Sequence, residues 1–413
     1  MKSKAIISNK LHTLINVFTV CLGIGLLLFA SADVSAEFVP NEELVSSQPD
    51  MIDPEYDQST SQFVWADSAG SLWIGKWDRK GMFKPSSGKA ILVDPDAASV
   101  YDLKITFNGP EWIQSAEGPE IVYTKFLPGM PHVPETGRLA LAQLGPDGQW
   151  TYKFLEPDDY PRNGPYASED KCDASPRIAY VDPDLNHYWR DLNDPATEEL
   201  IPLMTNLTKR SVRWVQGARV AVYQARSPIN DSSQVFTYDV DTKELEQITF
   251  DSGRKDNNPP WMWQAPEYDN DYIILATVVN EDNSEEFRIY RQLDINNDGN
   301  MVWSNIFTAA APPDGEIGSP EPFTYLGHSY IFFQMTFEQE YSTSIWLANI
   351  DSADPFLRKV SDDSLLRHRF DPEVVIIYNK GPYIYYNRVD RDPECTSLCY
   401  EGIFRAYTGL SPN

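Results

Sequence analysis

Short runs of alternating apolar and polar residues recur along most of the chain. Residues 211–250 give a clear example, in which "SVRWVQG", "ARVAVYQA", "QVFTYDVD" and "LEQITF" follow one another with Gly, Pro, Asn and Asp between them. Alternation with a period of two, bounded by such turn residues, predicts antiparallel strands joined by hairpins. We expect these strands to form one small sheet. No amphipathic helix is expected between residues 37 and 413.

The same pattern is repeated along the chain at intervals of roughly 50 residues. Each repeat opens on a similar phrase: DPEYD from Asp53, GPEWI from Gly109, GPYAS from Gly164, SVRWV from Ser211, PPWMW from Pro259, SPEPF from Ser319 and DPEVV from Asp371. This spacing is too long for short solenoid units and is typical of a four-stranded propeller blade. The sequence therefore predicts an all-β fold, a seven-bladed β-propeller with four antiparallel strands per blade. Six blades are the alternative if the first unit is only a closing flap.

The last repeat lacks a fourth strand before the chain ends. The segment "AEFVPNEEL", residues 36–44, could supply that strand and close the ring. Residues 37–413 are accordingly expected to form a single propeller domain, because the apolar faces of each blade are buried only by its neighbours.

Three stretches share a strand–Asp–turn–strand–Thr pattern: "VFTYDVDTKELEQITFDSG" (235–253), "IWLANIDSADPFLRKVSDD" (345–363) and "HYWRDLNDPATEELIPLMT" (187–205). On these residues the chain resembles TolB-like propellers of the WD40-like repeat class, and the likeness extends over most of residues 37–413. The Pro-Glu openings are also similar to those of propeller-fold glycan-active enzymes. Both resemblances imply a propeller, and neither fixes a function.

The N-terminus has the features of an export signal. Lys2, Lys4 and Lys10 precede an apolar stretch over residues 15–30, and small residues at 34–36 suit a cleavage site. An uncleaved anchor is the alternative, but the apolar run is short for a span of roughly 20 residues. Residues 1–36 are therefore interpreted as a signal peptide of a secreted or periplasmic protein, with no membrane span in the mature chain.

Charge limits the class of partner. The chain has 34 Lys and Arg against 61 Asp and Glu, a net charge of −27. Phosphate recognition needs a basic surface, so nucleic acid is excluded as the expected partner. The expected partner is therefore a polysaccharide or a protein ligand. The sequence does not give the oligomeric state.

The geometry of a propeller predicts which residues of each repeat lie at the channel mouth. The first strand of each blade lines the channel, and its start lies on one face together with the loop between the second and third strands. Candidate ligand-binding residues at this mouth are Glu111, His132, Tyr166, Trp261 and Glu321. The catalytic candidates, should the chain be an enzyme, are Arg213, His368, Asp371 and Glu373.

Two functions are compatible with this map. A binding module would present the mouth to a glycan or a protein. A polysaccharide lyase or glycoside hydrolase would use paired carboxylates, or an Arg with a His or Tyr base, at the same place. The Glu of the Pro-Glu phrase recurs in several blades, which favours a structural role for it, because chemistry needs residues in unlike surroundings.

Two further motifs have a candidate structural role. Asp294, Asn296, Asp298 and Asn300 have the alternating oxygen spacing of a calcium loop, although a plain hairpin turn explains the same residues. No cofactor is otherwise expected. Cys395 and Cys399 could close a small disulfide loop in an oxidising compartment.

Overall fold

The structure is a computed structural model that describes most of residues 38–412. The segments outside the described part are 1–37, 49, 84–89, 99–107, 156–159, 169–174, 206–210, 230, 251–257, 296–300, 338–341, 391–398 and 413. The predicted signal peptide therefore lies outside it. Of the predicted calcium ligands, Asn296, Asp298 and Asn300 lie outside it as well, whereas the backbone of Asp294 is described. The remaining chain contains one compact unit, Pro40–Asn413.

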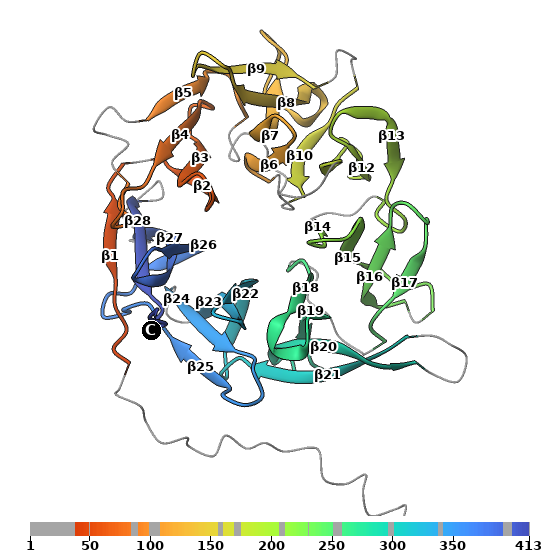
Figure 1. Ribbon diagram of the computed structural model, residues 1–413, viewed down its shortest axis with the longest axis vertical. Helices are drawn as coiled ribbons and strands as arrows, with labels where there is room; N and C mark the ends of the chain where they lie inside the picture. Colours follow the sequence, from red (N-terminus) through yellow and green to blue (C-terminus); the bar gives the residue numbers. More distant parts are fainter. Residues whose placement is uncertain are drawn as a thin grey trace, which may run out of the picture. The chain divides into compact units, whose positions relative to one another are not determined.

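Seven four-stranded antiparallel sheets are arranged around a common centre (Figure 1). Blade 1 consists of β2 (Ile52–Asp57), β3 (Gln62–Ala66), β4 (Leu72–Lys76) and β5 (Ile91–Asp94). Blade 2 consists of β6 (Glu111–Ser115), β7 (Gly118–Phe126), β8 (Gly137–Leu144) and β9 (Trp150–Phe154). Blade 3 consists of β10 (Asn163–Ala167), β11 (Arg177–Val181), β12 (His187–Asp191) and β13 (Asp194–Leu200). The seven-bladed prediction is confirmed, and the six-bladed alternative is wrong.

The other blades have the same order from the centre outward. Blade 4 consists of β14 (Val212–Trp214), β15 (Val220–Arg226), β16 (Ser233–Asp239) and β17 (Leu245–Gln247). Blade 5 consists of β18 (Trp261–Ala265), β19 (Asp271–Val279), β20 (Glu285–Ile295) and β21 (Met301–Ala310). Blade 6 consists of β22 (Gly315–Tyr325), β23 (His328–Phe337), β24 (Ser342–Asn349) and β25 (Phe356–Lys359). Blade 7 consists of β26 (His368–Ile377), β27 (Gly381–Asp390), β28 (Cys399–Tyr407) and β1 (Glu43–Ser46).

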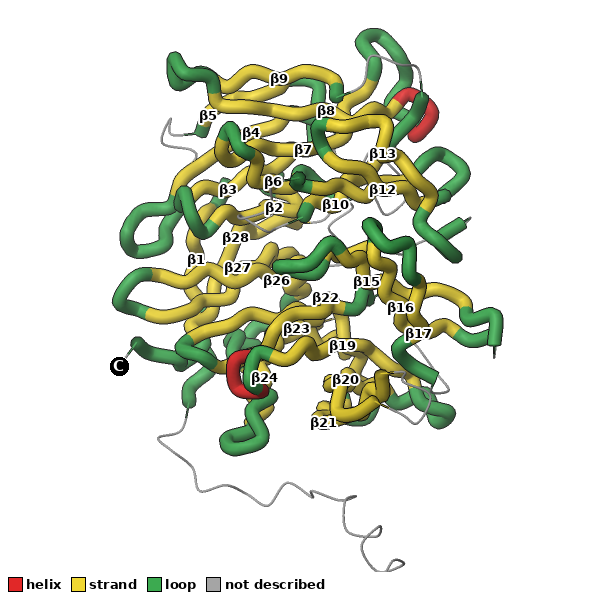
Figure 2. Tube along the Cα trace, turned by 45° about the vertical axis from the view of Figure 1, so that its right-hand side comes forward, coloured by secondary structure: helices red, strands yellow, loops and turns green. Residues whose placement is uncertain are grey.

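Helical structure in the described residues is confined to short 3-10 turns, such as η2 (Pro134–Thr136) and η3 (Pro266–Tyr268) (Figure 2). No helix among these residues is long and apolar enough to cross a bilayer. The fold thus follows the period-two alternation of the sequence almost throughout.

The ring is closed by the N-terminal strand, as the missing fourth strand of the last repeat predicts. In Figure 1 β1 lies beside β28, where Glu43 is paired with Arg405 and Leu44 with Phe404. The strand begins later than the predicted segment, at Glu43. One blade is therefore built from both ends of the chain, which ties the two ends together.

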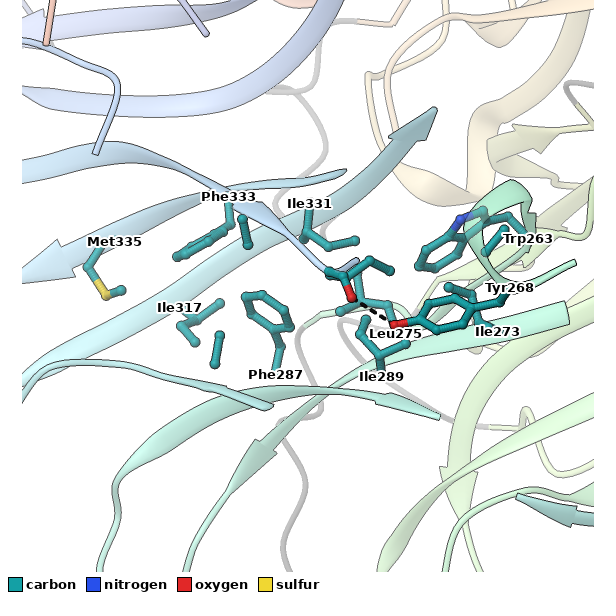
Figure 3. Packing of buried hydrophobic residues seen from close by; sticks show 14 residues of the cluster. Trp263, Tyr268, Ile273, Leu275, Phe287, Ile289, Ile317, Ile331, Phe333 and Met335 are labelled. Atoms are coloured by element: carbon teal, nitrogen blue, oxygen red, sulfur yellow. Dashed lines mark hydrogen bonds between the residues drawn. The ribbon is translucent and has the colours of Figure 1, made fainter. Parts of the chain in front are cut away.

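The hydrophobic core lies between blades rather than within them. Figure 3 shows the layer between blades 5 and 6, where Phe287 and Phe333 meet edge to face at 5.4 Å. The Tyr268 hydroxyl donates a hydrogen bond of 2.8 Å to the carbonyl oxygen of Ile350 across this layer. Comparable layers join blades 1 and 2, 2 and 3, 3 and 4, 4 and 5, and 7 and 1. Each blade is thus held by its neighbours, and the inner strands are fixed in place.

Candidate functional site: the channel ring

The Xaa-Pro phrase of the repeat forms a β-bulge in four of the inner strands. The residue before Pro has a left-handed backbone in each of them: φ is 48° at Asp53, 56° at Gly164, 44° at Ser319 and 56° at Asp371. The strand register shifts at the same places. Because Pro has no N–H to give to the ladder, a bulge accommodates it without losing a bond. The phrase is therefore a structural device that fixes the residue after Pro on the inner strand.

Nine side chains of the inner strands interact around the channel, and we call them the channel ring. Its members are Asp53, Glu55, Glu111, Tyr166, Arg213, Trp261, Glu321, Asp371 and Glu373. The carboxyl groups come from blades 1, 2, 6 and 7, whereas blades 3, 4 and 5 contribute the tyrosine, the arginine and the tryptophan. The ring is thus strongly asymmetric, although the blades are alike.

Arg213 is the cation around which the ring is organised. Its Nη1 lies 3.9 Å from Oε1 of Glu111, and its Nη2 lies 3.7 Å from Oε1 of Glu321. The guanidinium carbon lies 4.5 Å from the ring centroid of Trp261 and 5.5 Å from that of Tyr166, both within cation–π range. One side chain of blade 4 therefore contacts residues of blades 2, 3, 5 and 6.

Asp53 and Asp371 form a hydrogen-bonded carboxyl pair where blades 1 and 7 meet. Burial, the charge of Asp53 and the hydrogen bond with Asp53 together hold the pKa of Asp371 well above its ordinary value. Burial also raises the pKa of Asp53, although the hydrogen bonds from Asp371 and from the N–H of Gly109 oppose that shift. The pKa of Asp371 is the more strongly raised of the two, so the Asp371 carboxyl group is the one favoured to donate the hydrogen bond within the pair and Asp53 the one favoured to accept it.

Gly109 makes this pair sterically possible. A Cβ atom at position 109 would lie 2.1 Å from Oδ2 of Asp53, closer than any real contact. The glycine that opens the second repeat therefore leaves space for a carboxylate from the first, and its N–H binds that carboxylate.

Glu55 and Glu373 complete the acidic side of the ring. Burial holds the pKa of Glu55 well above its ordinary value, and the charges of Glu373 and Glu111 add to the shift. Burial raises the pKa of Tyr166 to about 12, with Arg213 acting in the opposite direction. The ring thus contains carboxyl groups whose pKa values are raised by burial beside carboxylates paired with a cation, which is the combination that acid–base chemistry uses.

The raised pKa of Asp371 predicts an unusual pH dependence of stability. The folded chain binds this proton more tightly than the unfolded chain, so the contribution of Asp371 to stability falls as pH rises from its ordinary pKa towards the raised value. Asp371→Asn keeps the shape and tolerates the left-handed backbone. We expect it to raise the melting temperature at about pH 8, by roughly 2 °C for each kcal/mol of repulsion removed, and to have less effect at about pH 5.

The matched control is Asp314→Asn, which changes an exposed aspartate with a φ of 63° in the turn before β22. Thermal unfolding should show that the difference in melting temperature between this variant and wild type is the same at both pH values. A melting temperature of Asp371→Asn that lies below wild type at the higher pH would contradict the assignment of the proton.

The structure brings together seven of the sequence-predicted site residues, namely Glu111, Tyr166, Arg213, Trp261, Glu321, Asp371 and Glu373. The histidines stack elsewhere: His132 lies 4.3 Å from Phe126, centroid to centroid, in the loop between β7 and β8, and His368 stacks on Phe370 at the start of β26. Sequence reasoning missed Asp53. The signal was present, because Asp53 opens the same Asp-Pro-Glu phrase as Asp371.

The remaining predicted sites fall mainly outside the described residues. Asn296, Asp298 and Asn300 lie there, although β20 and β21 pair as a hairpin from Ile295 to Met301. Cys395 lies there as well, whereas Cys399 begins β28. Calcium binding and the disulfide stay predictions. Within the described part of the chain, no three His, Cys, Asp or Glu side chains are grouped as a metal ion would need.

A cavity of about 300 Å³ adjoins the ring at the inner strands of blades 4, 5 and 6. Four aromatic side chains line it: Trp214, Trp261, Trp263 and Phe323. Exposed polar side chains, Gln216, Gln264 and Thr324, share the lining. We call this space the aromatic cavity, and Trp261 belongs both to it and to the channel ring.

Comparison with known proteins supports the fold but identifies neither a family nor a function. No protein-family model and no curated protein matches the chain. Among solved structures, an ancestral GH74 enzyme is 10% identical with a TM-score of 0.54, and the match covers 88% of this chain and 48% of that one. The β-propeller domain of Cps50 (Swd1) from Myceliophteria thermophila is 9% identical with a TM-score of 0.53, covering 89% of this chain and all (100%) of the domain.

The chain is a seven-bladed β-propeller. TolB from Acinetobacter baumannii is also among the similar structures, at 16% identity and a TM-score of 0.35, with 84% of this chain and 79% of that chain covered. Identities this low support the fold alone. The function of the propeller must therefore be argued from its own channel ring and aromatic cavity.

Proposed function

We propose that the propeller is a secreted or periplasmic module that binds a glycan in its central channel. The observation that carries this proposal is the aromatic cavity, where indole and phenyl rings are combined with exposed amide and hydroxyl groups. Flat rings stack on the apolar faces of sugars, while amides and hydroxyls pair with sugar hydroxyl groups. Its volume of about 300 Å³ is at the lower end of the range typical of ligand sites. Export is supported by the basic and apolar pattern of residues 1–36.

The channel ring narrows the class of glycan. Its only described cation, Arg213, is already engaged by Glu111 and Glu321, and the other charged members are carboxyl groups. An acidic sugar entering beside them would meet like charges. The expected ligand of the channel is therefore an uncharged sugar chain.

Calorimetric titration of the full chain with a panel of neutral oligosaccharides tests the proposal. Gln264→Ala removes an exposed amide of the cavity, and we expect about tenfold weaker binding with an unchanged melting temperature. Gln149→Ala is the matched control, because Gln149 is also an exposed glutamine and lies in the β8–β9 turn of blade 2. If no neutral glycan binds, or if both variants bind like wild type, the cavity is not the glycan site.

A second candidate is a glycan-degrading enzyme at the same mouth. The specific observation that favours it is the Asp53–Asp371 pair, in which one carboxyl group keeps a proton while its partner accepts a hydrogen bond. Such a pair can donate and accept protons. Assay of reducing ends and of unsaturated uronates on acidic and neutral polysaccharides distinguishes the two functions. Product formation that is abolished by Asp371→Asn would support the enzyme function over the binding function.

A further inference from the structure

A larger groove lies on the face opposite the channel mouth, where blades 1 and 7 meet. Its volume is about 750 Å³, and the turns β2–β3 and β26–β27 and the loop after β4 form its walls. The walls carry two aromatic side chains, Trp77 and Tyr378. Tyr378 is 86% exposed, which leaves its ring almost entirely available to a ligand. The groove shares no residue with the channel ring or the aromatic cavity.

The walls of the groove are fixed by hydrogen bonds between the two blades. The side chain of Gln58 accepts from the N–H of Ile376 at 2.8 Å and donates to its carbonyl oxygen at 2.9 Å. The Tyr385 hydroxyl donates to the carbonyl oxygen of Gly81 at 2.6 Å, and Arg405 donates to that of Lys80 at 2.5 Å, so the loop after β4 is attached to blade 7. The groove is therefore formed before any ligand arrives, which reduces the ordering cost of binding.

The charge at the groove is opposite to that of the protein as a whole. The turns around it carry the exposed residues Lys76, Arg79, Lys80 and Lys380 on a chain of net charge −27. The nearby carboxylates are engaged by the backbone: Asp78 accepts from the N–H groups of Lys80 and Met82, and buried Asp57 accepts from those of Ser59 and Thr60. Arg79 has no ion pair or hydrogen bond with the described part of the chain. The guanidinium is thus open to an anionic ligand.

We propose that this groove is a second binding site, for an anionic saccharide. Tyr378 offers a face for a sugar ring, Asn379 an amide for hydroxyl groups, and Arg79 a planar fork for a carboxylate or sulfate. A peptide strand is a poorer fit, because Gln58 already occupies both the N–H and the carbonyl oxygen of Ile376. The propeller would then hold a neutral chain in the aromatic cavity and an acidic one in the groove, at two separate sites near the ends of the inner strands.

The experiment is calorimetric titration of the full chain with oligogalacturonate, with chondroitin sulfate oligomers and with uncharged galactan oligomers. Binding of either anionic probe, weaker at higher salt, is the expected result, whereas any binding of galactan should be independent of salt and unchanged by substitutions in the groove. Tyr378→Ala and Arg79→Gln should each weaken it by about tenfold. Both residues are exposed, so folding should be unchanged and is checked by melting temperature.

The controls separate this site from the channel. Arg226→Gln removes the same charge from the exposed end of β15, and Gln264→Ala alters the aromatic cavity; neither should change binding of the anionic probes. Preference between the two probes tells whether a carboxylate or a sulfate is recognised. Failure of both probes to bind, or equal binding by all variants, overturns the proposal for the groove. Neither result bears on the glycan site proposed in the channel. Binding of poly-glutamate that is also lost in Tyr378→Ala would assign the groove to acidic peptides and overturn it as well.

Discussion

Replacing Glu42 by alanine is expected to lower the free energy of unfolding by about 3–5 kcal/mol. Glu42 stands just before β1, and its carboxylate accepts from Arg369 at 2.8 Å, from Arg388 and from the Tyr386 hydroxyl at 2.7 Å. The Arg369 side chain is fully buried, at 0% exposure. Removing the carboxylate leaves buried guanidinium groups without their anion, and the cost of an unpaired buried charge dominates the effect.

The next residue provides a matched control. Glu43 also binds an arginine, Arg405, at 2.7 Å, but the Glu43 side chain is 55% exposed. The Arg405 guanidinium is only 3% exposed, but it keeps its hydrogen bonds to the carbonyl oxygen of Lys80 and to the Tyr385 hydroxyl when the solvent-screened carboxylate is removed, so Glu43→Ala should cost clearly less than Glu42→Ala. Urea unfolding of both variants, followed by tryptophan fluorescence, gives the comparison. Equal losses for the two would show that the N-terminal strand is held by its backbone pairing alone, and that the buried cluster around Glu42 does not hold the ring closed.

The blade repeat could be predicted from the sequence because each blade repeats one local code. Alternation in stretches such as residues 220–226 and the turn residues between them specify hairpins without reference to distant residues. Closure by the N-terminal strand could be predicted as well, because an incomplete last blade leaves an open edge that another strand must cover. The exact strand, Glu43–Ser46, could not, since its register depends on contacts with β28.

The channel site could be predicted only in part. The map of inner strands grouped Arg213 with Glu321, whose side chains lie 3.7 Å apart in the structure, but alternation alone treats Asp371 as an ordinary strand residue. The bulge before Pro, with its left-handed residue, arises from the missing N–H of proline and from the shape of the neighbouring blade. The pairing of Asp53 with Asp371 also requires that the first and last blades touch, which is a property of the closed ring.

Arg213→Met is expected to be the most damaging change in the channel ring. The variant keeps an unbranched side chain between Tyr166 and Trp261 but removes the cation that Glu111 and Glu321 face. Loss of one partner from a largely buried charge cluster costs about 3–5 kcal/mol when the carboxylates are ionised. The Arg213 side chain is 20% exposed, so solvent screens part of the effect, and the lower end of this range is expected.

The pH dependence identifies the cause of that loss. Arg213 lowers the pKa of Asp53 and Asp371, against the stronger effect of burial. Without the cation both pKa values rise further, and the folded chain binds more protons than the unfolded chain over a wider range of pH. The stability of Arg213→Met should therefore fall more steeply than that of wild type between about pH 5 and about pH 8.

Two further variants distinguish loss of charge from loss of packing. Combining Arg213→Met with Glu321→Gln removes one of the unpaired carboxylates, so the double variant should be more stable than Arg213→Met alone at the higher pH. Arg226→Met removes an equal charge whose partner Asp231 is exposed at the surface, and it should unfold like wild type. Urea unfolding at both pH values measures all of these. A loss in Arg213→Met that is independent of pH and not relieved by Glu321→Gln would mean that the side chain acts by packing between the two aromatic rings, and the ring would then be held by shape rather than by charge.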